Sequence, residues 1–158
     1  MELNQIRASL KATRNELLPL FDAPENVLVK RYAPGKWTIH ELLCHLADAE
    51  SVYLWRVCRA MAEPGAPVEG FDQDRWATGL NYPGRSLEAA RQLFEGTRGQ
   101  LLSYLERLQP ELLAHTVTHS ERGPLTLEQL IATVASHTEH HLTQIRAAKE
   151  GRTWEPAP

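Results

Sequence analysis

The stretch LTLEQLIATVASHTEHHLTQI, residues 125–145, predicts one long amphipathic helix. Thr126 and Gln129 stand three residues apart at its start, the spacing of a capping box that satisfies free backbone N–H groups of a first helical turn. The helix is expected to end near Glu150, with Gly151 as its C-cap. At helical periodicity one face carries an apolar stripe, composed of Leu127, Leu130, Ile131, Val134, Thr138 and Ile145.

Three other segments have helical patterns. The first is expected over about Glu2–Leu20, the second from the N-cap Thr38 to about Met61, and the third from after Ser86 to about Leu108. Four helices of comparable length predict an all-α four-helix bundle, with one domain over residues 1–158. The segments 62–85 and 109–124 contain several glycines or prolines and are expected to be a loop and an irregular link. The last residues, 152–158, are expected to be extended.

The connection 62–85 between the second and third helices is long for a compact domain. It is long enough to cross the bundle, so these two helices would run in the same direction. The second and fourth helices would then be antiparallel. The alternative is an ordinary up-down bundle with a flexible loop.

The composition argues against several partners and locations. The net charge is −3 and the 17 basic residues do not cluster, which argues against nucleic acid or an anionic membrane as partner. No apolar run approaches the ~20 residues of a membrane span, and the charged N-terminus is not typical of a signal peptide. On one helix Cys44 and Cys58 would lie about 21 Å apart, too far to form a disulfide. We therefore expect free thiols in a reducing cytoplasm.

Three of the chain's 7 histidines fall within five residues near the C-terminus. His137 and His141 lie within or beside the apolar stripe, four residues apart on one face, whereas His140 points away from it. On the second helix His45 borders a similar stripe. If the two helices are antiparallel, His45 and His141 lie at similar depths, about 10–12 Å from the same end of the bundle.

A histidine pair with i, i+4 spacing on one helical face is suited to a divalent metal ion. A third imidazole from a facing helix completes a three-histidine site with open coordination positions. The alternative is that each is a core-edge histidine with its own hydrogen bond, which is the preferred interpretation for any one of them alone. For the three together the sequence favours a metal. The HExxH signature of zinc proteases is absent, because Thr138 follows His137.

Three segments resemble the DinB superfamily: GKWTIHELLCHLADAE (residues 35–50), GFDQDRWA (70–77) and GPLTLEQLIATVASHTEHHLTQI (123–145). The resemblance implies a right-handed up-down-down-up bundle, often a homodimer. It also implies a metal triad of His45, His137 and His141, with Zn, Ni or Fe as the metal. A second histidine beside the last ligand, as with His140, is a common variant in that family.

The resemblance implies two chemistries for one centre. Some members resemble S-transferases that use a low-molecular-weight thiol, and others resemble metal hydrolases. A metal ion lowers the pKa of bound water or thiol, so both follow from one site. The predicted function is a metal-dependent enzyme acting on a small molecule. The alternatives are a non-catalytic metal-binding stress-response bundle and a purely interacting helical bundle.

A second group near the metal would identify the catalytic acid or base. The candidates are the carboxylates Asp48, Glu50, Asp72 and Asp74, of which Asp48 and Asp74 are retained as catalytic candidates. For Asp48 the preferred interpretation is a solvated carboxylate on a helix face. Asp72 and Asp74 lie in the long connection, where Arg75 and Trp76 could line a pocket. The preferred role of Phe71 and Trp76 is to anchor this loop, and His115 and His119 are expected to be solvent-exposed.

Overall fold

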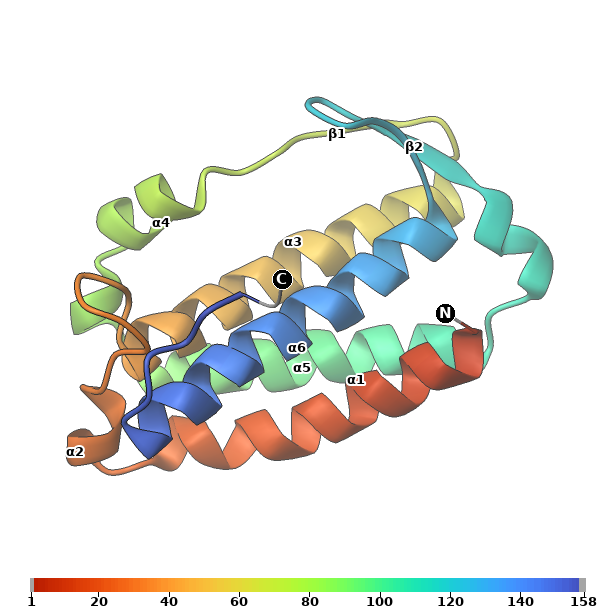
Figure 1. Ribbon diagram of the computed structural model, residues 1–158. Coiled ribbons are helices and arrows are strands. Elements are labelled where there is room, and N and C mark those ends of the chain that lie inside the picture. Colours follow the sequence, from red (N-terminus) through yellow and green to blue (C-terminus); the bar gives the residue numbers. More distant parts are fainter. Residues whose placement is uncertain (1, 157–158) are drawn as a thin grey trace.

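The computed structural model describes residues 2–156 and shows a four-helix bundle (Figure 1). Its long helices are α1 (Leu3–Leu17), α3 (Ile39–Ala62), α5 (Leu87–Glu106) and α6 (Leu127–Glu150). In Figure 1, α1 and α6 run in one direction and α3 and α5 in the other. The predicted up-down-down-up order, with a crossover between α3 and α5, is therefore confirmed.

Local signals determine where these helices begin and end. The Thr38 hydroxyl accepts from the Glu41 backbone N–H at 3.1 Å, and the Glu41 carboxylate accepts from the Thr38 backbone N–H at 2.7 Å. This reciprocal capping box starts α3, and Thr126 starts α6 in the same way. Gly151 ends α6 with a positive φ of 70°, a conformation that glycine adopts without steric cost.

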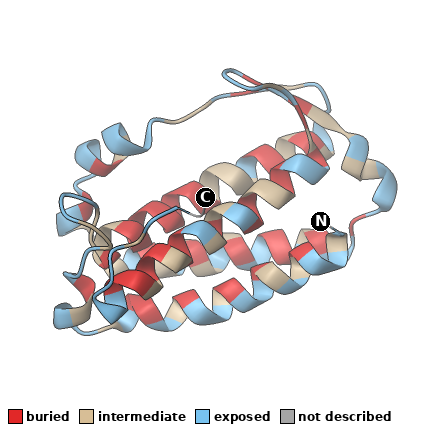
Figure 2. Ribbon diagram, viewed as in Figure 1, coloured by how far each residue is buried: buried red, intermediate tan, exposed pale blue. Residues whose placement is uncertain are grey.

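The helices bury their apolar faces against one another (Figure 2). One hydrophobic cluster includes Leu42, Phe94 and Ile145, and a second includes Leu10 and Ile131. The predicted stripe of α6 is buried along its whole length. Helical periodicity therefore correctly identified the inward face.

The two connections contain more regular structure than expected. The crossover between α3 and α5 includes β1 (Pro67–Val68), α4 (Gln73–Gly79) and a 3-10 turn at Tyr82–Gly84. The link between α5 and α6 includes a 3-10 turn at Pro110–Ala114, β2 (Thr116–His119) and β3 (Gly123–Thr126). Short turns at Leu18–Asp22 and at α2 (Glu25–Leu28) follow α1. Residues 152–156 form neither helix nor strand, and residues 157–158 of the predicted extended tail lie outside the described range.

The expectation of an irregular link at 109–124 was wrong. β2 pairs antiparallel with β3 and parallel with β1, with Pro67 opposite Thr118. The β-branched residues of β2 favour a strand, but its second partner comes from the distant crossover. This small sheet joins the crossover to the link that precedes α6. Both His115 and His119 were predicted to be exposed, but the sheet buries His119. His115 is half-buried, and its Nδ1 lies 3.2 Å from the Ala60 carbonyl oxygen.

The crossover also buries the face of α3 that points away from the main stripe. The Asp48 carboxylate, 4% exposed, accepts from the Tyr82 hydroxyl at 2.7 Å and from Arg85 Nη1 at 2.6 Å. The expectation of a solvated Asp48 was therefore wrong. Cys44 lies under the same segment, and burial raises its pKa to about 11. The Cys44 thiol is therefore neutral, and like Cys58 it forms no disulfide.

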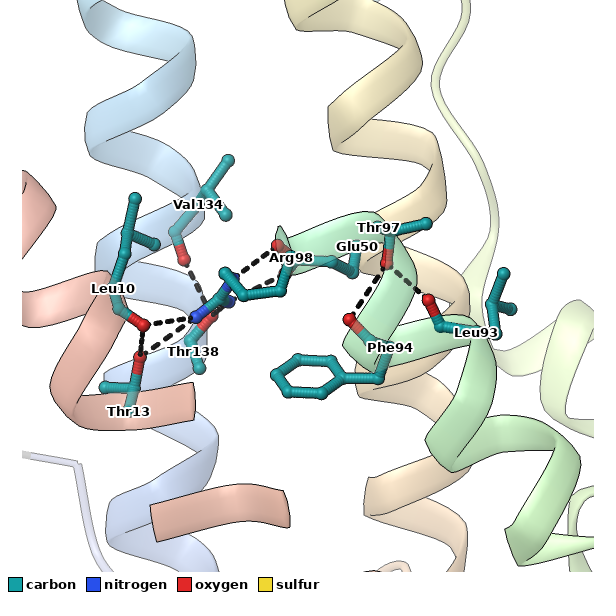
Figure 3. A network of polar contacts seen from close by, with 9 residues as sticks. All are labelled: Leu10, Thr13, Glu50, Leu93, Phe94, Thr97, Arg98, Val134 and Thr138. Atoms are coloured by element: carbon teal, nitrogen blue, oxygen red, sulfur yellow. Dashed lines mark hydrogen bonds and ion pairs between the residues drawn. The ribbon is translucent and has the colours of Figure 1, made fainter. Parts of the chain in front are cut away.

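A buried ion pair joins all four long helices (Figure 3). Arg98 of α5 donates to the Glu50 carboxylate of α3 through Nε at 2.5 Å and Nη2 at 2.7 Å. Arg98 also donates to the Leu10 carbonyl oxygen and the Thr13 hydroxyl of α1, and to the Thr138 hydroxyl of α6. Glu50 is thus a structural carboxylate and not the catalytic candidate that the sequence offered.

No helix within residues 2–156 is both long and apolar enough to cross a membrane.

Candidate metal centre

Three histidines from two antiparallel helices meet between α3 and α6. His45 Nε2 lies 3.1 Å from His137 Nε2, and His141 Nε2 lies 3.2 Å from the same atom. Their potential ligand atoms all lie within 4.8 Å of one another. The i, i+4 pair on α6 and the facing residue on α3 therefore come together as predicted.

Burial favours the neutral form of all three imidazoles. Desolvation, with a smaller contribution from the neighbouring rings, lowers the pKa of His45 to about 3 and that of His137 to about 2. Desolvation lowers the pKa of His141 to about 4, against the opposing effect of the hydrogen bond that its Nδ1–H donates to Gln144. Neutral imidazoles are the form that binds metal ions, so each ring can offer a nitrogen lone pair near pH 7.

The geometry of the three rings fits a metal ion better than it fits mutual hydrogen bonds. A neutral imidazole nitrogen carries either one proton or one lone pair. His137 Nε2 faces two other nitrogens and can form a directed hydrogen bond with only one of them. Two nitrogens bound to one ion at ~2.0–2.1 Å lie about 3–3.5 Å apart, which agrees with the observed separations of 3.1 and 3.2 Å.

The centre has three candidate protein ligands, and the described part of the chain offers no fourth. Within residues 2–156 no carboxylate or thiol joins the group of ligand atoms around His45, His137 and His141. His45 and His141 are buried, whereas His137 is only partly buried. Three protein ligands with open positions are typical of catalytic metal sites, whereas structural zinc sites have four.

Gln144 holds the ring of His141, a role that the sequence did not predict. Its side-chain oxygen lies 2.7 Å from His141 Nδ1 and therefore accepts that ring proton. Its position three residues after His141, on the same helical face, was the available signal. His45 differs, because its buried Nδ1 has no hydrogen-bond partner within residues 2–156. The ring of His45 instead packs against Trp37 at a centroid distance of 5.0 Å.

His140 points away from the centre, as predicted, and is exposed. Its Nε2 lies 3.2 Å from Gln144 Nε2, and its ring has edge contact with Trp154 at 4.9 Å. His140 is therefore not isolated from the site but reaches it through Gln144 and through an edge-on contact of its ring with the His141 ring at 5.1 Å.

The remaining acidic candidates lie outside the cluster. Asp72 is the N-cap of α4, where its carboxylate accepts from the backbone N–H groups of Asp74 and Arg75. Asp74 is exposed on the first turn of α4. The carboxylate of Asp48 is occupied by Tyr82 and Arg85, as described above. None of these acids contributes to the group of ligand atoms at the histidines.

Aromatic side chains surround the histidines. Phe71 of the crossover stacks on His45 at 6.3 Å and contacts Trp76 at 4.9 Å. The contact of Phe71 with His45 of α3 agrees with its predicted role in anchoring the loop to the bundle. Tyr53 contacts His137 at 5.3 Å. The aromatic surround explains the strong desolvation of the rings.

The lowered pKa values predict acid sensitivity of the metal-free protein. An unfolded histidine titrates near pH 6.5, so below that pH the unfolded chain binds protons that the folded histidines exclude. Stability should therefore fall as pH decreases below about 6.5, by up to about 1.4 kcal/mol per pH unit for each histidine. Urea unfolding across this range would measure it. His45→Leu should give a shallower slope of unfolding free energy against pH. An unchanged slope would contradict the lowered pKa of His45.

The sequence as a whole matches a known family. Residues 9–145 match the DinB superfamily. A protein of Oceanobacillus iheyensis named "Putative metal-dependent hydrolase" is 32% identical over 123 residues, which cover 77% of this chain and 69% of that protein. Another Oceanobacillus iheyensis protein with the same descriptive name is 26% identical over 152 residues, covering 96% of this chain and 86% of that protein.

Solved structures have the same fold. YfiT from Bacillus subtilis, described as a probable metal-dependent hydrolase with an unusual four-helix bundle topology, superposes with a TM-score of 0.86 at 18% identity. That similarity covers 98% of this chain and 89% of YfiT. A mycothiol-dependent maleylpyruvate isomerase superposes with a TM-score of 0.71 at 13% identity, covering 92% of this chain and 61% of that one. With a matching family pattern over most of its length and the YfiT fold, this chain belongs to the DinB superfamily.

Proposed function

We propose that the protein binds a divalent metal ion through Nε2 of His45, His137 and His141, and that it is a metal-dependent enzyme acting on a small molecule. The observation that carries this proposal is the convergence of three neutral imidazole nitrogens, with separations of 3.1 and 3.2 Å about His137 and no fourth protein ligand within residues 2–156. Zn, Ni and Fe all accept imidazole nitrogen.

When bound, such an ion acts as a Lewis acid and lowers the pKa of water or of a thiol. The chain's own residues do the rest. His45 and His141 are buried, whereas His137 is only partly buried, so a substrate would approach from the His137 side. Tyr53 borders this side through its contact with His137. Burial raises the pKa of Tyr53, so its hydroxyl is neutral.

Hydrolysis is the preferred reaction, because the relatives with 32% and 26% identity are named as metal-dependent hydrolases. Thiol transfer is the second candidate and rests on the resemblance to thiol-dependent family members. Asp48 is not the general base in this proposal, because its carboxylate is held by Tyr82 and Arg85. A role for Asp74 stays a prediction, as do the homodimer, the cytoplasmic location and the single domain over residues 1–158.

A groove beside the centre supports a substrate with an apolar part. It has a volume of about 280 Å³, and its lining includes Trp55, Phe71 and Trp76. Phe71 borders both this groove and the ring of His45. Trp55 is 47% exposed, although aromatic side chains are usually buried more completely. We assign the groove to the apolar part of the substrate.

The first test is metal content and turnover. Protein purified without chelator is expected to contain about one metal ion per chain by elemental analysis. A panel of ester, amide and thiol-transfer substrates should then give turnover that chelation abolishes and metal addition restores. Protein that neither contains nor takes up metal would contradict the proposal. Bound metal without turnover across the panel would favour the non-catalytic alternative.

A further inference from the structure

We propose that Trp154, His140 and Gln144 form a positioning chain that keeps the Nε2 lone pair of His141 directed into the metal centre. The inference rests on the proposed metal site and assigns a role to residues outside it. This positioning chain runs from Trp154 in the C-terminal segment, through the exposed His140, to the buried amide of Gln144. None of its members is a candidate ligand.

The first step is the proton position on His141. The Gln144 side-chain oxygen, 2.7 Å from His141 Nδ1, can only accept a hydrogen bond. The ring proton of neutral His141 therefore lies on Nδ1, and Nε2 carries the lone pair. His141 Nε2 is the atom that lies 3.2 Å from His137 Nε2.

The second step is the orientation of the Gln144 amide. Rotated by half a turn, the amide would present its NH2 group to His141 Nδ1, and the ring proton would move to Nε2 inside the centre. That proton would block metal binding at His141. In the observed orientation the NH2 group lies 3.2 Å from His140 Nε2, which accepts from it. Gln144 is only 4% exposed, so its amide depends on protein partners for its hydrogen bonds.

The third step is the position of the His140 ring. An exposed side chain samples several rotamers unless its neighbours restrict it. The Trp154 ring contacts His140 edge-on at 4.9 Å with an interplanar angle of 81°. Trp154 is held in turn by Nε1–H to the Thr143 hydroxyl and by backbone N–H to the Tyr32 carbonyl oxygen, both at 2.8 Å.

Figure 1 shows the chain turning back along α6 after the helix ends. The contacts of Trp154 with His140 and Thr143 place its ring beside this part of the helix. The C-terminal segment therefore acts on the centre through one ring contact and two hydrogen bonds. Metal affinity should then depend on residues that never touch the ion. The loss of metal affinity on substitution should be largest at Gln144, smaller at His140 and smallest at Trp154, because each of these residues lies further from the ligand atom along the positioning chain.

The decisive experiment compares Gln144→Leu with Gln144→Glu. Leucine has similar size but cannot accept the His141 proton, whereas glutamate can. Gln100→Leu, on the exposed face of α5, makes the same chemical change away from the site. His140→Phe and His115→Phe form a second matched pair. The two readouts are the 15N shifts of the His141 ring in the metal-free protein and the Kd for Zn²⁺ measured by chelator competition.

We expect His141 to carry its proton on Nδ1 in the metal-free wild type. We also expect Gln144→Leu to weaken zinc binding by about 10–100-fold, as loss of such orienting partners typically does. The zinc affinities of Gln144→Glu and Gln100→Leu should stay near that of the wild type. His140→Phe should lose less zinc affinity than Gln144→Leu.

A proton on Nε2 of His141 would overturn the inference, as would equal zinc affinity for Gln144→Leu and Gln100→Leu. The proposed function fails by a different result, namely a wild type that takes up no zinc. In that case the nitrogen shifts of the metal-free protein still decide the proton position on His141.

Discussion

Alanine at His45 or His141 is expected to abolish stoichiometric metal binding. Each substitution leaves two imidazoles, which cannot hold the ion in the three-ligand arrangement of an open catalytic site. The affinity for Zn²⁺ should fall by more than the ~10–100-fold typical of losing an orienting partner. Titration calorimetry on protein stripped of metal would measure it directly.

Two controls separate ligand loss from general damage. His115→Ala removes a half-buried histidine away from the centre and should leave zinc affinity unchanged. His140→Ala should cost far less zinc affinity than either ligand variant, because His140 is not a candidate ligand. It reaches His141 from outside the centre, through Gln144 and by an edge-on ring contact at 5.1 Å. Zinc should also raise the melting temperature of the wild type but not of the ligand variants, since only a bound ligand stabilises the folded state. If His140→Ala lost as much zinc affinity as His141→Ala, the assignment of His141 to the inward face of α6 and of His140 to the outward face would be overturned.

Arg98→Met is expected to destabilise the fold by about 3–5 kcal/mol, because it leaves the buried Glu50 carboxylate without its cation. The Arg98 side chain is fully buried and Glu50 is 2% exposed, so water cannot replace the lost contacts. Such a loss is a large part of the ~5–15 kcal/mol that stabilises a typical domain. Urea unfolding monitored by circular dichroism would measure it.

A double substitution tests the cause of this loss. Arg98→Met combined with Glu50→Leu removes both charges and should recover most of the stability, as apolar replacements of buried ion pairs often do. Arg14→Met is the matched control, because Arg14 and Glu95 form a half-exposed pair that should contribute about 1 kcal/mol or less. If Arg98→Met cost no more than Arg14→Met, the ion pair would not be the element that joins the four helices.

The sequence alone predicted the bundle and the three histidines of the candidate centre. Capping boxes at Thr38 and Thr126 and the periodicity of apolar residues are local properties, so they could be recognised without the fold. The i, i+4 spacing placed His137 and His141 on one face of α6. The length of the crossover indicated its course, which made α3 and α6 antiparallel and brought His45 to the pair.

Tertiary structure alone decided the roles of the acids. Asp48 lies on a face of α3 that periodicity predicts to be solvated, and it is buried because Tyr82 and Arg85 of the crossover cover it. Glu50 became structural because Arg98 of α5 reaches it. Side-chain burial depends on segments distant in sequence, and periodicity along one helix carries no information about them.

The small sheet and the positioning chain also depend on contacts that are decided only in the folded chain. The β2–β3 hairpin would be marginally stable by itself, and β1 of the crossover adds the third strand of the sheet. His140 was recognisable as a residue outside the triad, but the hydrogen bond that joins it to Gln144 and its ring contact with Trp154 appear only in the folded chain. The sequence thus determined which residues could bind a metal, because helical geometry is local. Only the folded chain determined what orients them, because those contacts join segments that are far apart along it.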